Sequence, residues 1–196
     1  MDDNSLKIVG LAGSLRRASF HRGLIRAAQE LAPGGVTVES YERLDEIPFF
    51  NQDVEDQGDP APVKGFKEKI RQADAVLIAT PEYDYAIPGV LTNAFDWVLR
   101  PPSPFRHKPV GIVGTSPGSA GTARGQMVLR QILVHPPAYV IPEPQMLIPF
   151  ALERFDVQTG DLVDERTQDG MRRFLKAFAE WTQRFKMSVP AYERSK

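Results

Sequence analysis

Cysteine is absent from this chain of 196 residues, and histidine occurs only at three widely separated positions, His21, His107 and His135. Without cysteine the chain has no disulfides, thiolate metal sites, iron–sulfur clusters or cysteine nucleophiles, and we expect no metal site. No hydrophobic run approaches the roughly 18 residues that a membrane-spanning helix needs. The N-terminal sequence MDDNS lacks the apolar segment of a signal peptide. We therefore expect a soluble, cytoplasmic protein with no membrane insertion.

An excess of either charge is also missing, because 24 Lys and Arg residues oppose 25 Asp and Glu residues. The resulting net charge of −1 provides no field that would attract nucleic acid or an anionic membrane. A hydrophobic content of 42% excludes a disordered chain. The length suits one compact domain, so we predict a single domain over residues 1–196. We expect its folded core to span about 6–186 and both termini to be flexible.

What is present is an alternation of short apolar runs with amphipathic segments. Short apolar runs bounded by glycine or proline are typical of buried strands, and apolar residues at helical spacing are typical of helices. We predict strands at 6–12, 36–41, 75–79, 109–115 and 138–141, and helices at 20–32, 62–73, 89–99, 123–133 and 164–186. A connection as long as 43–61, rich in carboxylates, is often functional or disordered.

Strands that alternate with helices of ten or more residues predict right-handed β–α–β units and a parallel sheet. Five strands in the flavodoxin-like order 2-1-3-4-5, with helices on both faces, fit this α/β pattern best. In such sheets the ligand binds outside the carboxyl ends of the strands, where the strand order reverses. The loops that follow the first, third and fourth strands are therefore the candidate binding loops.

The loop after the first strand, Gly13–Arg22, has the components of a phosphate site. Gly13 allows a tight turn, and the loop offers serine hydroxyls and three arginines. It also opens a helix, whose N-terminal N–H groups attract anions. The patterns of a P-loop and of a dinucleotide fingerprint are both absent. A solvated basic turn in which Ser19 only caps the helix is the alternative, and the residues alone leave it open.

The loop after the third strand, Pro81–Gly89, is stiffened by two prolines, which lowers the entropy cost of holding a flat ligand. Tyr83 and Tyr85 can lie against a ring. The backbone amides between Glu82 and Asp84 can meet the hydrogen-bonding edge of that ring. The alternative is a rigid turn in which the tyrosines only pack.

The loop after the fourth strand, Gly114–Gly121, is rich in small residues that let the backbone approach a ligand closely. It also matches G-x-S-x-G, the nucleophile motif of α/β-hydrolases. However, Pro117 has no N–H to complete an oxyanion hole after Ser116. No acid lies between Ser116 and His135, the one later histidine, so the order of a catalytic triad fails as well. We therefore reject a serine hydrolase.

Two of these motifs together resemble a known family. The first is Gly13-Ser14-Leu15-Arg16-x-x-Ser19, and the second is Pro81-Glu82-Tyr83-x-x-x-x-Pro88-Gly89-x-Leu91-x-Asn93-Ala94-x-Asp96-Trp97. The pair is similar to the NADPH-dependent FMN reductase family, and most similar to its subgroup of quinone, chromate and azo-dye reductases. The segment 123–133 also resembles that subgroup, and the resemblance spans about 6–185.

The resemblance implies a flavodoxin-like fold with bound FMN. It places the FMN phosphate at the first loop and the isoalloxazine ring between the second and third loops. The FMN-binding residues that it implies are Ser14, Arg16, Ser19, Phe20, His21, Pro81, Glu82, Tyr83, Asp84, Ser116 and Gly118.

Two positions depart from the pattern of the family, which commonly has asparagine where this chain has His21 and Asp84. His21 can still donate a hydrogen bond to phosphate, more strongly when it is protonated. Ionised Asp84 has no amide N–H to donate to the flavin. The alternative is that both substitutions are tolerated, since loop residues vary and much of the binding is made by the backbone.

The activity implied by the resemblance is transfer of two electrons from NADPH through FMN to a small acceptor, such as a quinone, chromate, an azo compound or free flavin. The flavin carries the hydride chemistry, so no catalytic side chain is expected. N–H groups from residues 116–121 would stabilise the negative charge of the reduced flavin. The two substrates would use the same place in turn, which predicts ping-pong kinetics. Arg16 or Arg17 can also reach the extra phosphate of NADPH.

Two other functions stay open. One is an electron-transfer flavodoxin without NADPH activity, although such carriers use charged docking surfaces that a net charge of −1 does not offer. The other is a scaffold protein that has lost its cofactor. The family usually forms dimers or tetramers, so we expect a homodimer or homotetramer, with Arg124 and the helix at 164–186 as candidate interface elements. The alternative for this helix is that it only covers the sheet, which fits its single apolar stripe.

Overall fold

The computed structural model describes residues 5–188, which form an α/β fold around one six-stranded parallel sheet. Its strands are β1 (Leu6–Ala12), β2 (Val36–Tyr41), β3 (Ala75–Ala79), β4 (Pro109–Thr115), β5 (Tyr139–Val140) and β6 (Met146–Ile148). The order is β2-β1-β3-β4-β5, and β6 also pairs with β4. The predicted flavodoxin-like order is confirmed. The predicted flexibility of the termini concerns residues 1–4 and 189–196, which lie outside the described residues.

The sixth strand was not predicted, because one strand position of the sheet is filled by two short pieces. β5 pairs with the start of β4, and β6 pairs with its end. Pro142 and Pro144 lie between the two pieces. Proline has no N–H to donate to a strand ladder, so the chain leaves the sheet after β5 and returns to it at β6.

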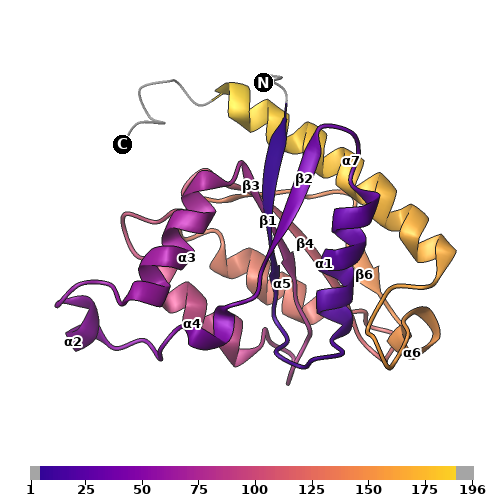
Figure 1. The fold of residues 1–196 in the computed structure, drawn as a ribbon, viewed down its shortest axis with the longest axis horizontal. Helices are drawn as coiled ribbons and strands as arrows, with labels where there is room; N and C mark the ends of the chain where they lie inside the picture. The colour runs from indigo at the N-terminus through magenta and orange to yellow at the C-terminus, as the bar shows by residue number, and fades with distance from the viewer. Residues whose placement is uncertain (1–4, 189–196) are drawn as a thin grey trace.

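Helices cover both faces of the sheet, and each face has its own apolar core (Figure 1). Alternate residues of one strand enter different cores: Ile8 of β1 packs in the first and Val9 in the second. Because both faces are covered, the central strands consist almost entirely of buried apolar residues. The helices on the first face are α1 (Phe20–Leu31) and α7 (Glu165–Ser188), and those on the second are α3 (Ala61–Gln72), α4 (Gly89–Val98) and α5 (Ala123–Ile132).

The long helix α7 packs its apolar stripe onto the sheet. Met171, Phe174, Leu175 and Phe178 are fully buried in the first core. Gly111 of β4 leaves the space for them, because a Cβ there would lie 3.0 Å from the Phe174 ring. The structure thus favours the alternative in which this helix covers the sheet. No helix within residues 5–188 is both long enough and apolar enough to cross a membrane.

The long connection at 43–61 packs beside α4. It holds the 3-10 helix η1 (Leu44–Glu46) and the short helix α2 (Gln52–Glu55). From α4, Asn93 Nδ2 and Trp97 Nε1 both donate to the carbonyl oxygen of Pro48, at 3.0 and 2.8 Å. These side chains fix the path of the connection along the helix. A further short helix, α6 (Ala151–Arg154), follows β6.

Candidate functional site

Three loops meet at the carboxyl-terminal edge of the sheet, the lower edge in Figure 1. We call them loop 1 (residues 13–19, after β1), loop 2 (residues 80–88, after β3) and loop 3 (residues 116–122, after β4). They are the loops that the strand order predicts as binding loops, since the order reverses between β1 and β3.

Direct contacts join loop 1 to loop 2, and the helix that follows loop 1 to the strand that precedes loop 3. Gly13 of loop 1 lies against loop 2, because a Cβ there would be 3.0 Å from Pro81 Cδ. The Thr115 N–H, at the end of β4, donates to His21 Nε2 in α1 at 3.5 Å. The structure therefore brings the residues predicted for one site to one edge of the sheet.

Loop 1 presents a run of backbone N–H groups without acceptors. From Leu15 to Ser19, no amide donates to any group within residues 5–188. The hydroxyl of Ser14, a residue only 6% exposed, also has no hydrogen-bond partner in this range. Free backbone N–H groups that lead into a helix N-terminus can bind an anion, because they point their hydrogens at it and the helix end carries partial positive charge. These groups fit a phosphate.

Ser19 caps α1, as the alternative for this loop predicts. Its Oγ accepts the N–H groups of His21 and Arg22 at 3.2 and 3.4 Å. The hydroxyl proton of Ser19 stays available, so capping and anion binding do not compete for it. The ring of Phe20 is buried, and the Arg16 guanidinium lies 5.0 Å from its centroid. Phe20 can therefore offer a ligand its backbone N–H and not its ring face.

His21 is a neutral residue in this structure. Its side chain is buried where α1 meets the end of β4. Burial lowers the pKa of His21 to about 4, and the nearby charge of Arg16 adds to the effect. Near neutral pH the His21 ring is therefore neutral in the chain without a ligand, and a neutral ring can still donate one N–H to an anion. The stronger donation expected of a protonated ring at this position thus concerns a state that burial disfavours in the chain without a ligand.

Loop 2 is a tight hairpin. Tyr83 and Ala86 exchange two backbone hydrogen bonds of 3.0 and 2.9 Å. Between them, Asp84 and Tyr85 have positive φ angles of 50° and 66°. Two successive left-handed residues are typical of a type I′ turn, which favours Asn, Asp and Gly. Asp84 therefore suits this turn as asparagine would.

The two tyrosines of loop 2 face solvent. Tyr83 is 52% exposed and Tyr85 is 69% exposed, so neither ring belongs to a core. The Tyr85 ring nevertheless packs against the Arg124 guanidinium, so the alternative in which a tyrosine of this loop serves packing stays open for Tyr85.

The Glu82 carboxylate turns toward α5. Its Oε2 accepts the Gly125 N–H at 2.9 Å, and it pairs with the Arg124 guanidinium. Burial raises the pKa of Glu82, but the hydrogen bonds from Gly125 and Arg124 outweigh burial and hold this pKa below its ordinary value. Only the backbone of Glu82 is free for a ligand. The pair with Arg124 was not predicted, because nothing in the local sequence signals a contact over 42 positions.

Loop 3 packs on β6 and keeps free amides. The Ser116 N–H donates to Ile148 O at 3.2 Å, and a Cβ at Gly121 would lie 2.8 Å from Ile148 N. The N–H groups from Gly118 to Gly121 donate to no group within residues 5–188. A Cβ at Gly118 would meet nothing within 4 Å, so the loop is open there. Of the donors predicted at 116–121, the Ser116 amide is engaged and the later four are available.

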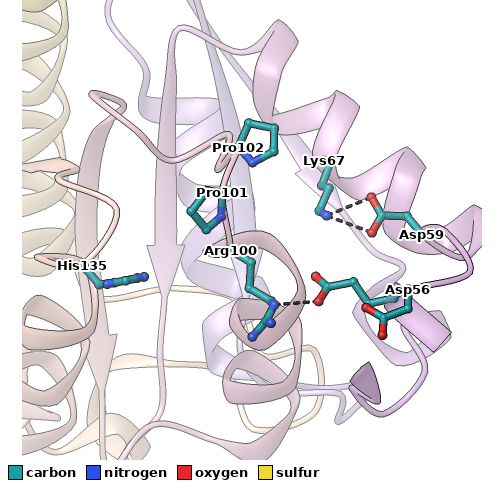
Figure 2. Close-up of a pocket in the computed structure, with 8 residues that line it drawn as sticks. Asp56, Asp59, Lys67, Arg100, Pro101, Pro102 and His135 are labelled. Atoms are coloured by element: carbon teal, nitrogen blue, oxygen red, sulfur yellow. Dashed lines mark hydrogen bonds and ion pairs between the residues drawn. The ribbon is translucent and has the colours of Figure 1, made fainter. Parts of the chain in front are cut away.

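A cavity of about 590 Å³ is lined by no residue of loops 1, 2 or 3. Figure 2 shows the side chains that line it. Lys67 pairs with Asp59 at 2.8 Å, and Arg100 pairs with Glu55 at 2.7 Å, so most of its charges neutralise one another. It lies at the C-terminal end of α4, about 15 Å from the end that follows loop 2. Within residues 5–188 no cluster of three or more histidine or carboxylate side chains is arranged to hold a metal ion. The cavity is therefore not the candidate site.

Sequence comparison assigns the chain to a family. The sequence model of the NADPH-dependent FMN reductases matches residues 6–153. An NAD(P)H-dependent FMN reductase of Pseudomonas aeruginosa is 41% identical over 184 residues, which cover 93% of this chain and 98% of that protein. A quinone reductase of Escherichia coli K12 is 42% identical over 184 residues, with the same coverage.

A solved structure leads to the same assignment. The flavoenzyme NAD(P)H:(acceptor) oxidoreductase from Paracoccus denitrificans has a TM-score of 0.82 and 31% sequence identity, over 92% of this chain and 98% of that chain. The family match covers all of loops 1, 2 and 3. The chain therefore belongs to the NADPH-dependent FMN reductase family and is an oxidoreductase.

Proposed function

We propose that the chain binds FMN across its three loops and passes two electrons from NADPH to a small quinone-like acceptor. Relatives named FMN reductase and quinone reductase support this activity. They do not support an electron carrier without NADPH activity. Chromate, azo compounds and free flavin are further acceptors to test.

Loop 1 is the proposed phosphate end of the site. The observation that carries the proposal is its run of unpaired amides from Leu15 to Ser19, beside the unpartnered hydroxyl of Ser14. An anion there would be held by helix-terminal N–H groups and by the exposed guanidinium of Arg16. The Ser19 hydroxyl, the Phe20 amide and the neutral His21 ring complete this set.

Loops 2 and 3 are the proposed ring end of the site. On one side lie Pro81 and the backbone of Glu82–Asp84, with Tyr83 exposed at the surface. On the other lie Ser116 and the free amides of Gly118–Gly121. Bound FMN would supply the hydride chemistry, which no side chain of the protein can provide. The amides of loop 3 would stabilise negative charge on the ring, and loop 2 would leave a flat face open to the acceptor.

Titration with FMN tests this site. The purified protein should be yellow, or the apoprotein should bind FMN with quenching of flavin fluorescence. Arg16→Ala should weaken FMN binding about tenfold, since it removes a charged partner of the phosphate. Arg172→Ala is the control, because Arg172 is an exposed arginine of α7 paired with Asp169. A protein that binds no FMN would contradict the proposal, as would equal effects of the two substitutions.

We further propose one domain over residues 1–196, a homodimer or homotetramer, and a cytoplasmic location. The two apolar cores share one sheet, which supports a single domain. Met127 on α5 and Leu152 on α6 are 65% and 63% exposed, and apolar side chains of this kind support an association surface. NADPH is an intracellular reductant, which supports the location.

A further inference from the structure

The first turn of α5 is capped from a distant part of the chain. Thr122, at the N-cap position of α5, has a φ of 69° and makes no side-chain capping bond. Instead, Glu82 Oε2 accepts the Gly125 N–H at 2.9 Å. A carboxylate is favoured at this place, because the N-terminal end of a helix carries partial positive charge. Loop 2 and α5 are thus joined by one buried side chain.

Arg124 extends this link into the turn of loop 2. Its guanidinium pairs with the Glu82 carboxylate, and its Cζ lies 3.9 Å from the centroid of the Tyr85 ring. A cation over an aromatic face is attracted to it. One arginine therefore holds the hairpin at two points, before the turn at Glu82 and within the turn at Tyr85.

Gly125 lets the helix approach the hairpin closely. A Cβ at this position would lie 3.2 Å from Ala86 O and 3.4 Å from Glu82 Cβ. Ala86 is also hydrogen-bonded to Tyr83 across the hairpin. Helix, carboxylate and hairpin therefore form one packed unit, and we call Glu82, Arg124, Gly125 and Tyr85 the cross-tie.

The cross-tie joins the two sets of free amides on either side of the proposed ring position. In loop 2, the N–H groups of Glu82, Asp84 and Tyr85 donate to no group within residues 5–188. In loop 3, the free amides of Gly118–Gly121 lead directly into α5, which starts at residue 123. The bond from Glu82 to α5 therefore links the two sets directly, in addition to the pairing of β3 with β4.

We propose that Glu82 is a positioning residue, whose carboxylate fixes the amides of loop 2 relative to those of loop 3 and does not itself bind the cofactor. The inference rests on the proposed FMN site. Family resemblance places Glu82 among the FMN-binding residues, and the structure assigns its side chain a supporting role. The carboxylate is ionised at neutral pH because, although burial raises the pKa of Glu82, its hydrogen bonds from Gly125 and Arg124 lower that pKa further.

Three substitutions test this role. Glu82→Ala removes the cap and the ion pair together, whereas Glu82→Gln keeps an acceptor for the Gly125 N–H and loses the charge. Asp74→Ala is the matched control. Asp74 also accepts a backbone N–H, from Lys7 at 2.8 Å, and pairs with a cation, Lys186 at 3.2 Å. It precedes β3 and so lies at the opposite edge of the sheet.

Amide hydrogen exchange tests the cross-tie in the FMN-free protein. In Glu82→Ala, the amides of Tyr83, Ala86 and Gly125 should exchange about tenfold faster than in the wild type, because the bond between hairpin and helix is lost. Glu82→Gln should show a smaller effect, and Asp74→Ala should show none at these amides. Wild-type exchange at all three amides in Glu82→Ala would overturn the positioning role, whether or not FMN binds.

FMN titration and flavin potentiometry test the consequence for the cofactor. Glu82→Ala should bind FMN about tenfold more weakly and shift its midpoint potential, because the amides around the ring are displaced. Glu82→Gln should recover part of the affinity, and Asp74→Ala should match the wild type in both measurements. If the wild type binds FMN and Glu82→Ala matches it in affinity and potential, the inference is wrong. If the wild type binds no FMN, the proposed function fails instead.

Discussion

His21 makes the stability of the fold depend on pH. Its pKa is about 4 in the folded chain and 6.5 in its ordinary state, so between these values the unfolded chain binds a proton that the folded chain does not. The stabilisation is complete above pH 6.5 and is lost as the pH falls toward 4. We expect His21 alone to lower the free energy of unfolding by on the order of 2 to 3 kcal/mol between pH 7 and pH 4.5.

Urea unfolding of the wild type and His21→Asn at both pH values measures this effect. Asparagine does not titrate, whereas the carboxylates of the surface titrate in both proteins and cancel in the comparison. The wild type should therefore lose more stability on acidification than His21→Asn. An equal loss in the two proteins would show that the ring is not buried in its neutral form.

The backbone conformation at position 84 accepts aspartate as readily as asparagine. A positive φ of 50° is reached easily by Asn and Asp, whose short polar side chains tolerate left-handed backbone. Aspartate at this position can therefore form the same hairpin as asparagine. The N–H groups that loop 2 offers belong to the backbone, so they do not depend on this side chain. The departure at this position therefore removes one side-chain donor and leaves the rest of the loop intact.

Two helical glycines differ in how closely a neighbouring segment packs against them, and so in the effect that alanine should have on stability. A Cβ at Gly23 in α1 would lie 1.8 Å from the carbonyl oxygen of Gly160, whereas a Cβ at Gly65 in α3 would meet nothing within 4 Å. We expect Gly23→Ala to lower the free energy of unfolding by about 2 kcal/mol, since the clash outweighs the better helix propensity of alanine. Gly65→Ala should raise it by about 0.5 to 1 kcal/mol.

Thermal and urea unfolding of these two variants give the comparison. The two substitutions are chemically identical, so the sign of the change reports only on the neighbours of each helix. A stabilised Gly23→Ala would mean that the loop containing Gly160 does not pack against α1 as the structure shows.

Most elements could be predicted from the sequence, because their signals are local. The observed β3 and β4 coincide with the predicted strands at 75–79 and 109–115, where short apolar runs end in polar or glycine-containing loops. β6 could not be predicted, because it has only three residues and follows Pro142 and Pro144, which are unfavourable in a strand. The common location of the three loops could also be predicted, because each follows a parallel strand and parallel strands end at the same edge of the sheet.

The roles of particular side chains in the candidate site could not be predicted in the same way. The use of Glu82 as a cap depends on a helix that begins about forty positions later, and no periodicity encodes such a contact. The neutral state of His21 depends on burial, which the sequence does not state. Both features are products of tertiary packing, whereas the free amides of loops 1 and 3 follow from glycine-rich and helix-opening segments.

At the scale of the whole molecule, one edge of the sheet carries all the groups proposed to act on both substrates. Loops 1, 2 and 3 converge there, and the cavity near α4 lies at the other end of that helix. With one place for NADPH and the acceptor, NADP must leave before the acceptor enters.

We expect parallel lines in double-reciprocal plots of rate against NADPH at several concentrations of a soluble quinone. NADP should inhibit competitively against the quinone, which separates this scheme from two independent sites. Lines that intersect would show that both substrates bind together, and the shared place would then be wrong even if FMN binds as proposed.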